Sequence, residues 1–104
     1  MNVGEQLHDL AEKLLALIRA TPEVAQKKAL RTKLTAVLKE TERLAATNVR
    51  TDTKKYRAAC DALDEANREV QGAIDDLATV AKTIHTVAEV LDLVAEIGAK
   101  AGGA

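Results

Sequence analysis

Hydrophobic residues recur at helical spacing along nearly the whole chain. In the first segment, leucine, alanine and isoleucine side chains stand three or four positions apart, from Leu7 to Ile18, with charged residues between them. Asn2 is a good helix cap, and Glu5, three residues later, can complete a reciprocal capping box. The pattern predicts a first helix over about residues 3–20.

A second helix is predicted after Thr21 and Pro22. Thr21 suits the cap, and Pro22 suits the first helical position because its missing N–H would have no partner there. Apolar residues from Leu30 to Leu44 then share one face, which extends this helix over about residues 22–48. Residues 47–53 have low helix propensity, so the main reversal of the chain is expected there, with Thr51 or Asp52 as the next cap.

The rest of the sequence predicts one very long helix, about residues 53–98. Apolar side chains alternate there in steps of three and four, which is typical of a coiled-coil-like heptad seam. The seam comprises Thr53, Tyr56, Cys60, Leu63, Asn67, Val70, Ile74, Leu77, Ala81, Ile84, Ala88, Leu91, Ala95 and Gly98. Asn67, a polar residue on this seam, is expected to fix the register of packing. A break at Gly72 would give a four-helix bundle instead.

The fold class that follows is all-α: an antiparallel bundle of three helices in a single domain, residues 1–98. Only 1% of the residues are aromatic, so the core must consist of leucine, isoleucine, valine and alanine. Five glycines and one proline leave few turns for a β-sheet architecture. The small residues of 99–104 predict a flexible tail.

The predicted helix lengths imply a partner. The third helix would span roughly 68 Å and the second about 40 Å, so the C-terminal part would extend beyond its cover. That part is apolar on most sides, and a homodimer with a four-helix core is the simplest way to bury it. A helix of another protein would serve equally. The predicted oligomer interface comprises Val80, Ile84, Val87, Val90, Leu91, Leu93, Val94 and Ile97.

Charge is spread unevenly although the formal net charge is only −1. Basic residues form a candidate patch for binding a partner: Lys27, Lys28, Arg31, Lys54, Lys55 and Arg57. Such a patch could bind nucleic acid or an acidic protein surface. Tyr56 is the only aromatic residue available for stacking and no helix-turn-helix spacing is evident, which disfavours nucleic acid.

No motif in the sequence indicates catalysis, a metal or another cofactor, so none is predicted. Cys60 lies on the apolar seam and is expected to be a buried small hydrophobe. His8 and His85 are far apart, and neither belongs to a set with metal-ligand spacing. The single cysteine gives no evidence of an oxidising compartment. No secretory signal and no transmembrane segment is predicted, so the expected location is cytoplasmic.

The sequence therefore predicts a non-catalytic helical protein–protein interaction module that self-associates through its C-terminal helix, acting as an adaptor, an inhibitor or a chaperone-like binder. One alternative is a helical protein that binds lipid or another apolar surface. A second alternative is a binder of nucleic acid or of an acidic protein through the basic patch.

Overall fold

The computed structural model describes residues 2–47 and 49–97, and these contain four helices and no strand. The helices are α1 (Val3–Ala20), α2 (Val24–Ala45), α3 (Lys54–Asp75) and α4 (Val80–Ala95), with a single 3-10 turn, η1 (Leu77–Thr79), between the last two. The predicted all-helical class is confirmed. α2 ends at Ala45 and α4 ends at Ala95, each three residues before the predicted helix end. Asn48, Gly98 and the tail predicted over 99–104 lie outside the described residues.

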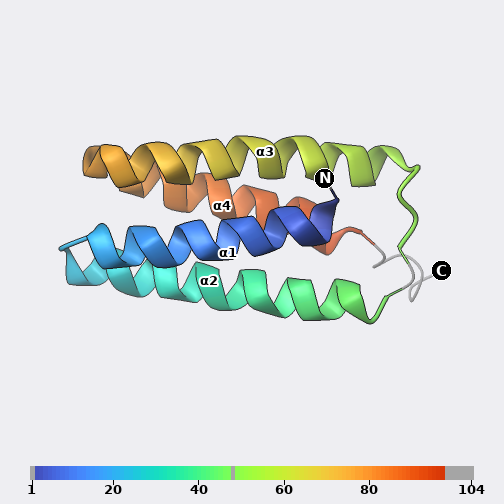
Figure 1. The fold of residues 1–104 in the computed structure, drawn as a ribbon, viewed down its shortest axis with the longest axis horizontal. Helices are drawn as coiled ribbons and strands as arrows, with labels where there is room; N and C mark the ends of the chain where they lie inside the picture. Colours follow the sequence, from blue (N-terminus) through green and yellow to red (C-terminus); the bar gives the residue numbers. More distant parts are fainter. Residues whose placement is uncertain (1, 48, 98–104) are drawn as a thin grey trace.

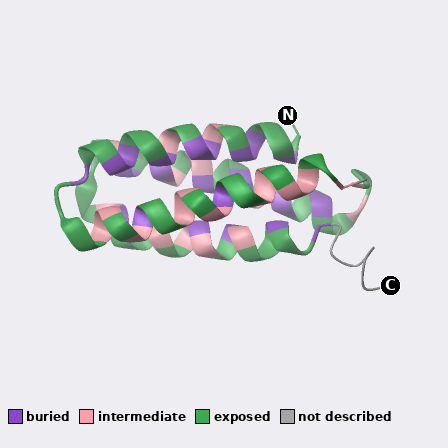
Figure 2. Ribbon diagram, turned by 90° about the horizontal axis from the view of Figure 1, so that it is seen from below, coloured by how far each residue is buried: buried purple, intermediate pink, exposed green. Residues whose placement is uncertain are grey.

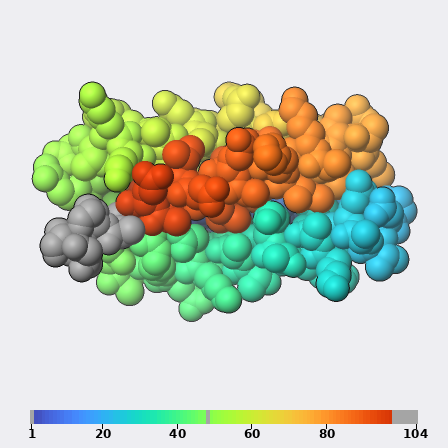
Figure 3. All heavy atoms as spheres, turned by 180° about the vertical axis from the view of Figure 1, so that it is seen from behind, coloured from blue at the N-terminus to red at the C-terminus, as the bar shows by residue number. Residues whose placement is uncertain are grey.

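Successive helices run in opposite directions and form a bundle of two hairpins (Figure 1). α1 packs against α2 and α3, while α4 packs against α3 and α2. Seen from behind, α4 lies between α3 and α2 (Figure 3). The connection from α2 to α3 therefore crosses the end of the bundle diagonally. As a result α1 and α3 are neighbours that run in the same direction, and so are α2 and α4.

Polar side chains fix the start of α1 and of α3. The predicted capping box is present: Asn2 Oδ1 accepts from the Glu5 N–H at 2.8 Å, and Glu5 Oε1 accepts from the Asn2 N–H at 3.2 Å. Thr53 caps α3 by accepting from the Tyr56 N–H at 3.1 Å, so the cap lies one residue beyond the predicted Asp52. Each interaction satisfies an N–H that the helix itself cannot.

The predicted start of the second helix is wrong by two residues. Thr21 ends α1 rather than beginning α2: its buried hydroxyl donates to the Leu17 carbonyl at 2.7 Å. α2 begins at Val24, and Glu23 at its cap makes no side-chain hydrogen bond. A threonine hydroxyl can serve either helix end, and the carbonyls of α1 are its partners here.

The single long helix predicted over residues 53–98 is wrong, because the chain reverses at Asp76. Its backbone leaves the helical region, with φ −140° and ψ 89°. Asp76 Oδ1 accepts from the Ala78 N–H at 3.3 Å, and the Thr79 hydroxyl donates to the Asp76 carbonyl at 2.9 Å. The break does not fall at Gly72, which stays inside α3 and whose carbonyl accepts from the Asp76 N–H.

The heptad seam also changes phase at this reversal. In α3 the predicted positions Tyr56, Leu63 and Val70 are buried. In α4 the buried face lies one residue earlier than predicted, at Val80, Thr83, Val87, Val90 and Val94. The predicted seam of α4 carries three alanines, and because a valine buries more apolar surface than an alanine, the valine stripe packs inward.

The C-terminal residues predicted to form an oligomer interface mostly lie in the core of the single chain. Five of the eight are buried: Val80, Val87, Val90, Val94 and Ile97. Ile84 and Leu91 are half-buried, and Leu93 is 37% exposed. Figure 2 shows the buried residues facing the interior of the bundle. Since α4 folds back beside α2 and α3, the unequal helix lengths that implied a dimer do not exist.

Replacing Asp76 with alanine should lower the free energy of unfolding by about 1 kcal/mol, because the turn loses the side chain that accepts from the Ala78 N–H. Asp75→Ala is the matched control, since Asp75 is also exposed and ends α3. Urea unfolding followed by circular dichroism measures both variants. Equal losses in the two variants would contradict the assigned role of Asp76.

Candidate interaction surface

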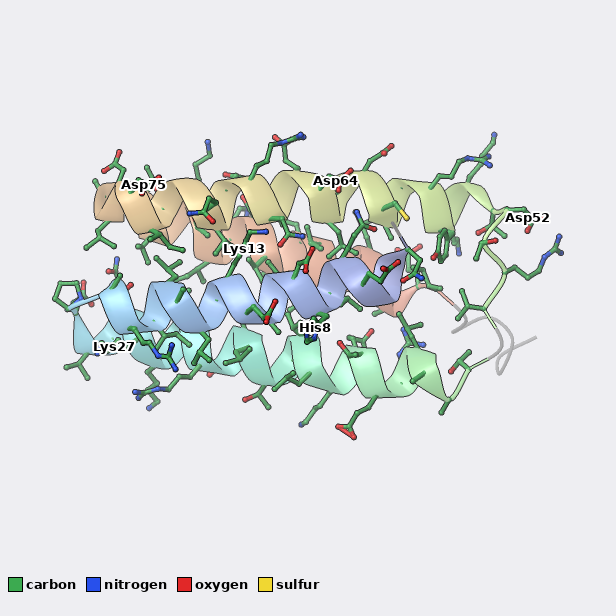
Figure 4. All side chains as sticks on the ribbon, viewed as in Figure 1. His8, Lys13, Lys27, Asp52, Asp64 and Asp75 are labelled. Carbon is green, nitrogen blue, oxygen red and sulfur yellow. The ribbon has the colours of Figure 1, made fainter. Side chains whose placement is uncertain are left out.

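The structure divides the predicted basic patch into two parts at opposite ends of the bundle. Lys27, Lys28 and Arg31 lie near the start of α2, whereas Lys54, Lys55 and Arg57 lie in the first turn of α3. Figure 4 labels Lys27 at one end and Asp52, two residues before α3, at the other. The six residues therefore cannot act as one patch.

The part on α2 remains a basic surface, and Arg19 in the last turn of α1 joins it. Lys28, Arg31 and Arg19 are exposed, and Lys27 is half-buried. Within the described residues none of these four cations forms an ion pair. By contrast, Lys55 of the other part pairs with Glu96 at 3.6 Å.

A groove of about 640 Å³ opens at the other end of the bundle, where the α2–α3 connection crosses it. Val3, Leu44, Val49 and Tyr56 supply apolar side chains, and the Tyr56 hydroxyl accepts from the Val3 N–H at 3.0 Å. The complete lining is Asn2, Val3, Gly4, Glu5, His8, Asp9, Thr41, Leu44, Ala45, Val49, Thr51 and Tyr56. No local pattern in the sequence indicates this groove, because its lining joins residues of α1 and α2 to Val49, Thr51 and Tyr56.

The groove opens onto a larger surface, which we call the α1–α2 face. Residues seven positions apart on a helix point in nearly the same direction. Stepping by seven from a residue that lines the groove therefore gives the residues that extend the same surface along that helix. His8 leads to Leu15 on α1, and Ala45 leads to Leu38, Arg31 and Val24 on α2. The α1–α2 face comprises Glu5, His8, Glu12, Leu15, Arg19, Val24, Lys28, Arg31, Thr35, Leu38, Glu42 and Ala45, all of them exposed.

Charge on the α1–α2 face is separated along the bundle. Acidic Glu5 and Glu42 lie near the groove, with Glu12 further along α1. The basic residues Arg19, Lys28 and Arg31 lie toward the turn that joins α1 to α2. Leu15 lies between Glu12 and Arg19 on α1, and Leu38 lies between Arg31 and Glu42 on α2; these leucines are 41% and 49% exposed.

Arg43 joins the end of α4 to α2. Its guanidinium donates to the carbonyls of Ile97 at 2.9 Å and Val94 at 3.0 Å, and it forms two further hydrogen bonds with Glu40. A cation at a helix C-terminus satisfies carbonyls that the helix leaves open and interacts favourably with the helix dipole. No spacing in the sequence indicated this contact, because the partners are 51 and 54 residues apart.

A group of polar side chains joins α1 to α3. The buried Gln6 amide donates to the Cys60 carbonyl at 2.9 Å and to Asp64 at 2.7 Å. Asn67 donates to the Gln6 carbonyl at 3.3 Å and to the Leu63 carbonyl at 3.1 Å. Among the described residues, the buried side-chain oxygens of Gln6 and Asn67 have no hydrogen-bond donor. A polar link of this kind favours one register of α1 on α3.

Cys60, His8 and His85 carry side chains that could serve catalysis or bind a metal ion. Burial, with Asp61 and Asp64 nearby, raises the pKa of the half-buried Cys60 thiol, which disfavours the reactive thiolate. His8 and His85 are exposed on different helices, each 3.8 Å from a glutamate one turn later. Within residues 2–47 and 49–97, no group of three or more potential ligands is placed to hold a metal ion.

Comparison of the chain with protein-family models, curated proteins and solved structures gave no match. In the part of the chain that the structure describes, no helix has both the length and the apolar character needed to cross a bilayer.

Replacing Arg43 with lysine should lower the free energy of unfolding by about 1–2 kcal/mol, because an ammonium group cannot reproduce the planar set of donors that joins Glu40 to the end of α4. Arg19→Lys is the matched control on an exposed helix surface. Urea unfolding provides the measurement. An Arg43→Lys variant as stable as Arg19→Lys would show that the contact contributes nothing.

Asp52 should titrate below its ordinary pKa of 3.8, because hydrogen bonds from the Arg50 guanidinium favour the carboxylate. A lowered folded-state pKa means that the stabilisation is complete above the ordinary value and is lost as the pH falls through the folded value. Arg50→Gln should return the pKa of Asp52 toward 3.8. A carboxyl-carbon NMR titration of both proteins tests this, and an ordinary value in the unmodified chain would refute it.

Proposed function

We propose that this chain is a non-catalytic helical protein–protein interaction module that binds its partner through the α1–α2 face. The observation that carries the proposal is the apolar groove of about 640 Å³ that opens onto this exposed face. The C-terminal helix, which the sequence favoured as the interface, offers less surface because all four of its valines lie in the core.

The groove suits an apolar side chain of a protein partner. Leu44, Val49 and Tyr56 would surround such a side chain, while Thr41 and Thr51 offer hydroxyl groups at the margin. Interfaces gain most of their affinity from a few side chains that fill pockets of this kind, and a polar rim then excludes water. The exposed Leu38 extends the apolar contact beyond the groove.

The two alternative functions have less support. Binding to lipid would require the apolar residues of α4 at the surface, whereas Val80, Val87 and Val94 are fully buried. Binding to nucleic acid would use a continuous basic patch, and the two halves of the predicted patch lie at opposite ends of the bundle.

A photo-crosslinking side chain at position 45, beside the groove, tests the proposal. Ala45 and Ala58 are both exposed helical alanines, but only Ala45 lines the groove. Irradiation in the native cells should give discrete protein adducts from position 45 and few from position 58, as measured by gel shift and mass spectrometry. Equally sparse adducts at the two positions would overturn the proposed function.

A further inference from the structure

We propose that the partner of the α1–α2 face is a second copy of this chain, bound in antiparallel orientation. This inference rests on the proposed function and assigns the partner of the same surface. It differs from the dimer that the sequence predicted, because it uses the first hairpin rather than the C-terminal helix.

The order of charges along the α1–α2 face supports this assignment. On α1, Glu5, Glu12 and Arg19 are seven residues apart, so one stripe changes from acidic to basic toward the turn. Because α2 runs in the opposite direction, its stripe from Lys28 to Glu42 changes sign in the same sense along the bundle. The face is therefore basic at the turn end and acidic at the groove end.

A two-fold axis across the middle of such a face matches unlike charges. Consider a two-fold axis that lies in the plane of the face and runs perpendicular to the helices. Rotation about it places the basic end of the second copy over the acidic end of the first. At the other end of the face, the acidic end of the second copy lies over the basic end of the first. An axis parallel to the helices would instead place like charges together. Charge complementarity thus selects the antiparallel arrangement.

The middle of the face is where such a dimer needs apolar contact. Leu15 of α1 and Leu38 of α2 lie between the charged ends and are 41% and 49% exposed. The rotation brings Leu15 of each copy to the level of Leu38 of the other, one such pair on either side of the axis. Burial of exposed leucines gives the contact a hydrophobic contribution that the charges alone would lack in physiological salt.

The size of the face agrees with a stable dimer. The molecule extends 43 × 20 × 18 Å, so a long side offers an area similar to the ~800 Å² that each partner buries in an interface of standard size. The three cations at the turn end of the face, Arg19, Lys28 and Arg31, have no ion-pair partner within the described part of the chain and would find carboxylates on the second copy.

Two variants with uniform charge provide the test. Lys28→Glu/Arg31→Glu makes both ends of the face acidic, and Glu12→Lys/Glu42→Lys makes both ends basic. Each variant alone should dimerise at least about tenfold more weakly than the unmodified chain, because like charges then face each other across the axis. An equimolar mixture should recover a heterodimer, since every end again meets its opposite.

Sedimentation over a range of concentrations measures these masses, with circular dichroism to verify that every variant is folded. Asp61→Lys/Asp92→Lys is the matched control for Glu12→Lys/Glu42→Lys, because it makes the same change in net charge at exposed positions of α3 and α4. It should dimerise like the unmodified chain. Recovery of the dimer in the mixture would also exclude misfolding as the reason for dissociation.

The inference fails if the unmodified chain keeps its monomer mass of 11.1 kDa at every concentration, or if the two uniform-charge variants dimerise as well as the control. The proposed function is judged separately, by crosslinking at position 45. If position 45 crosslinks to a different protein while the chain itself stays monomeric, the proposed function stands and the second copy is excluded as the partner. Adducts with the chain itself, lost in either uniform-charge variant, would support both.

Discussion

The reversal of the chain at Asp76 determines the architecture of the bundle. With φ −140° and ψ 89°, Asp76 cannot continue α3, and its side chain stabilises the turn by accepting from the Ala78 N–H. α4 consequently folds back and fills the space that α2 and α3 leave open (Figure 3). The resulting helices have 18, 22, 22 and 16 residues, and lengths this similar allow the valines of α4 to be covered within one chain.

The diagonal path from α2 to α3 is the second constraint, and it explains why one end of the bundle has a groove. A short connection would have placed α3 directly beside α2. Here the connection passes over the start of α1, where Tyr56 accepts from the Val3 N–H and Val49 lines the opening.

Local signals in the sequence predicted the helices well and their connection poorly. The capping box of Asn2 and Glu5 was readable because both partners lie within one turn. The reversal at Asp76 could not be predicted in this way. Apolar residues in steps of three and four indicate a helical face, but they do not show whether one helix or two carry that face. The contacts of Arg43 with α4 and the groove beside Val49 join segments far apart in the chain, which periodicity cannot relate to one another.

α2 and α3 have the same length but differ in how completely they are buried, and this difference supports the proposed binding surface. α3 buries six residues, whereas α2, of equal length, buries only Leu30 and Val37. The exposed Leu38 lies on α2, which also carries most of the cations of the first hairpin. The cations in the first two turns of α2 form no ion pair with a described acidic side chain. A helix that contributes little to its own core and exposes leucine is a reasonable choice for the proposed contact with a partner. Leu15 and Leu38, exposed on the α1–α2 face, are the apolar side chains that the proposed association would cover.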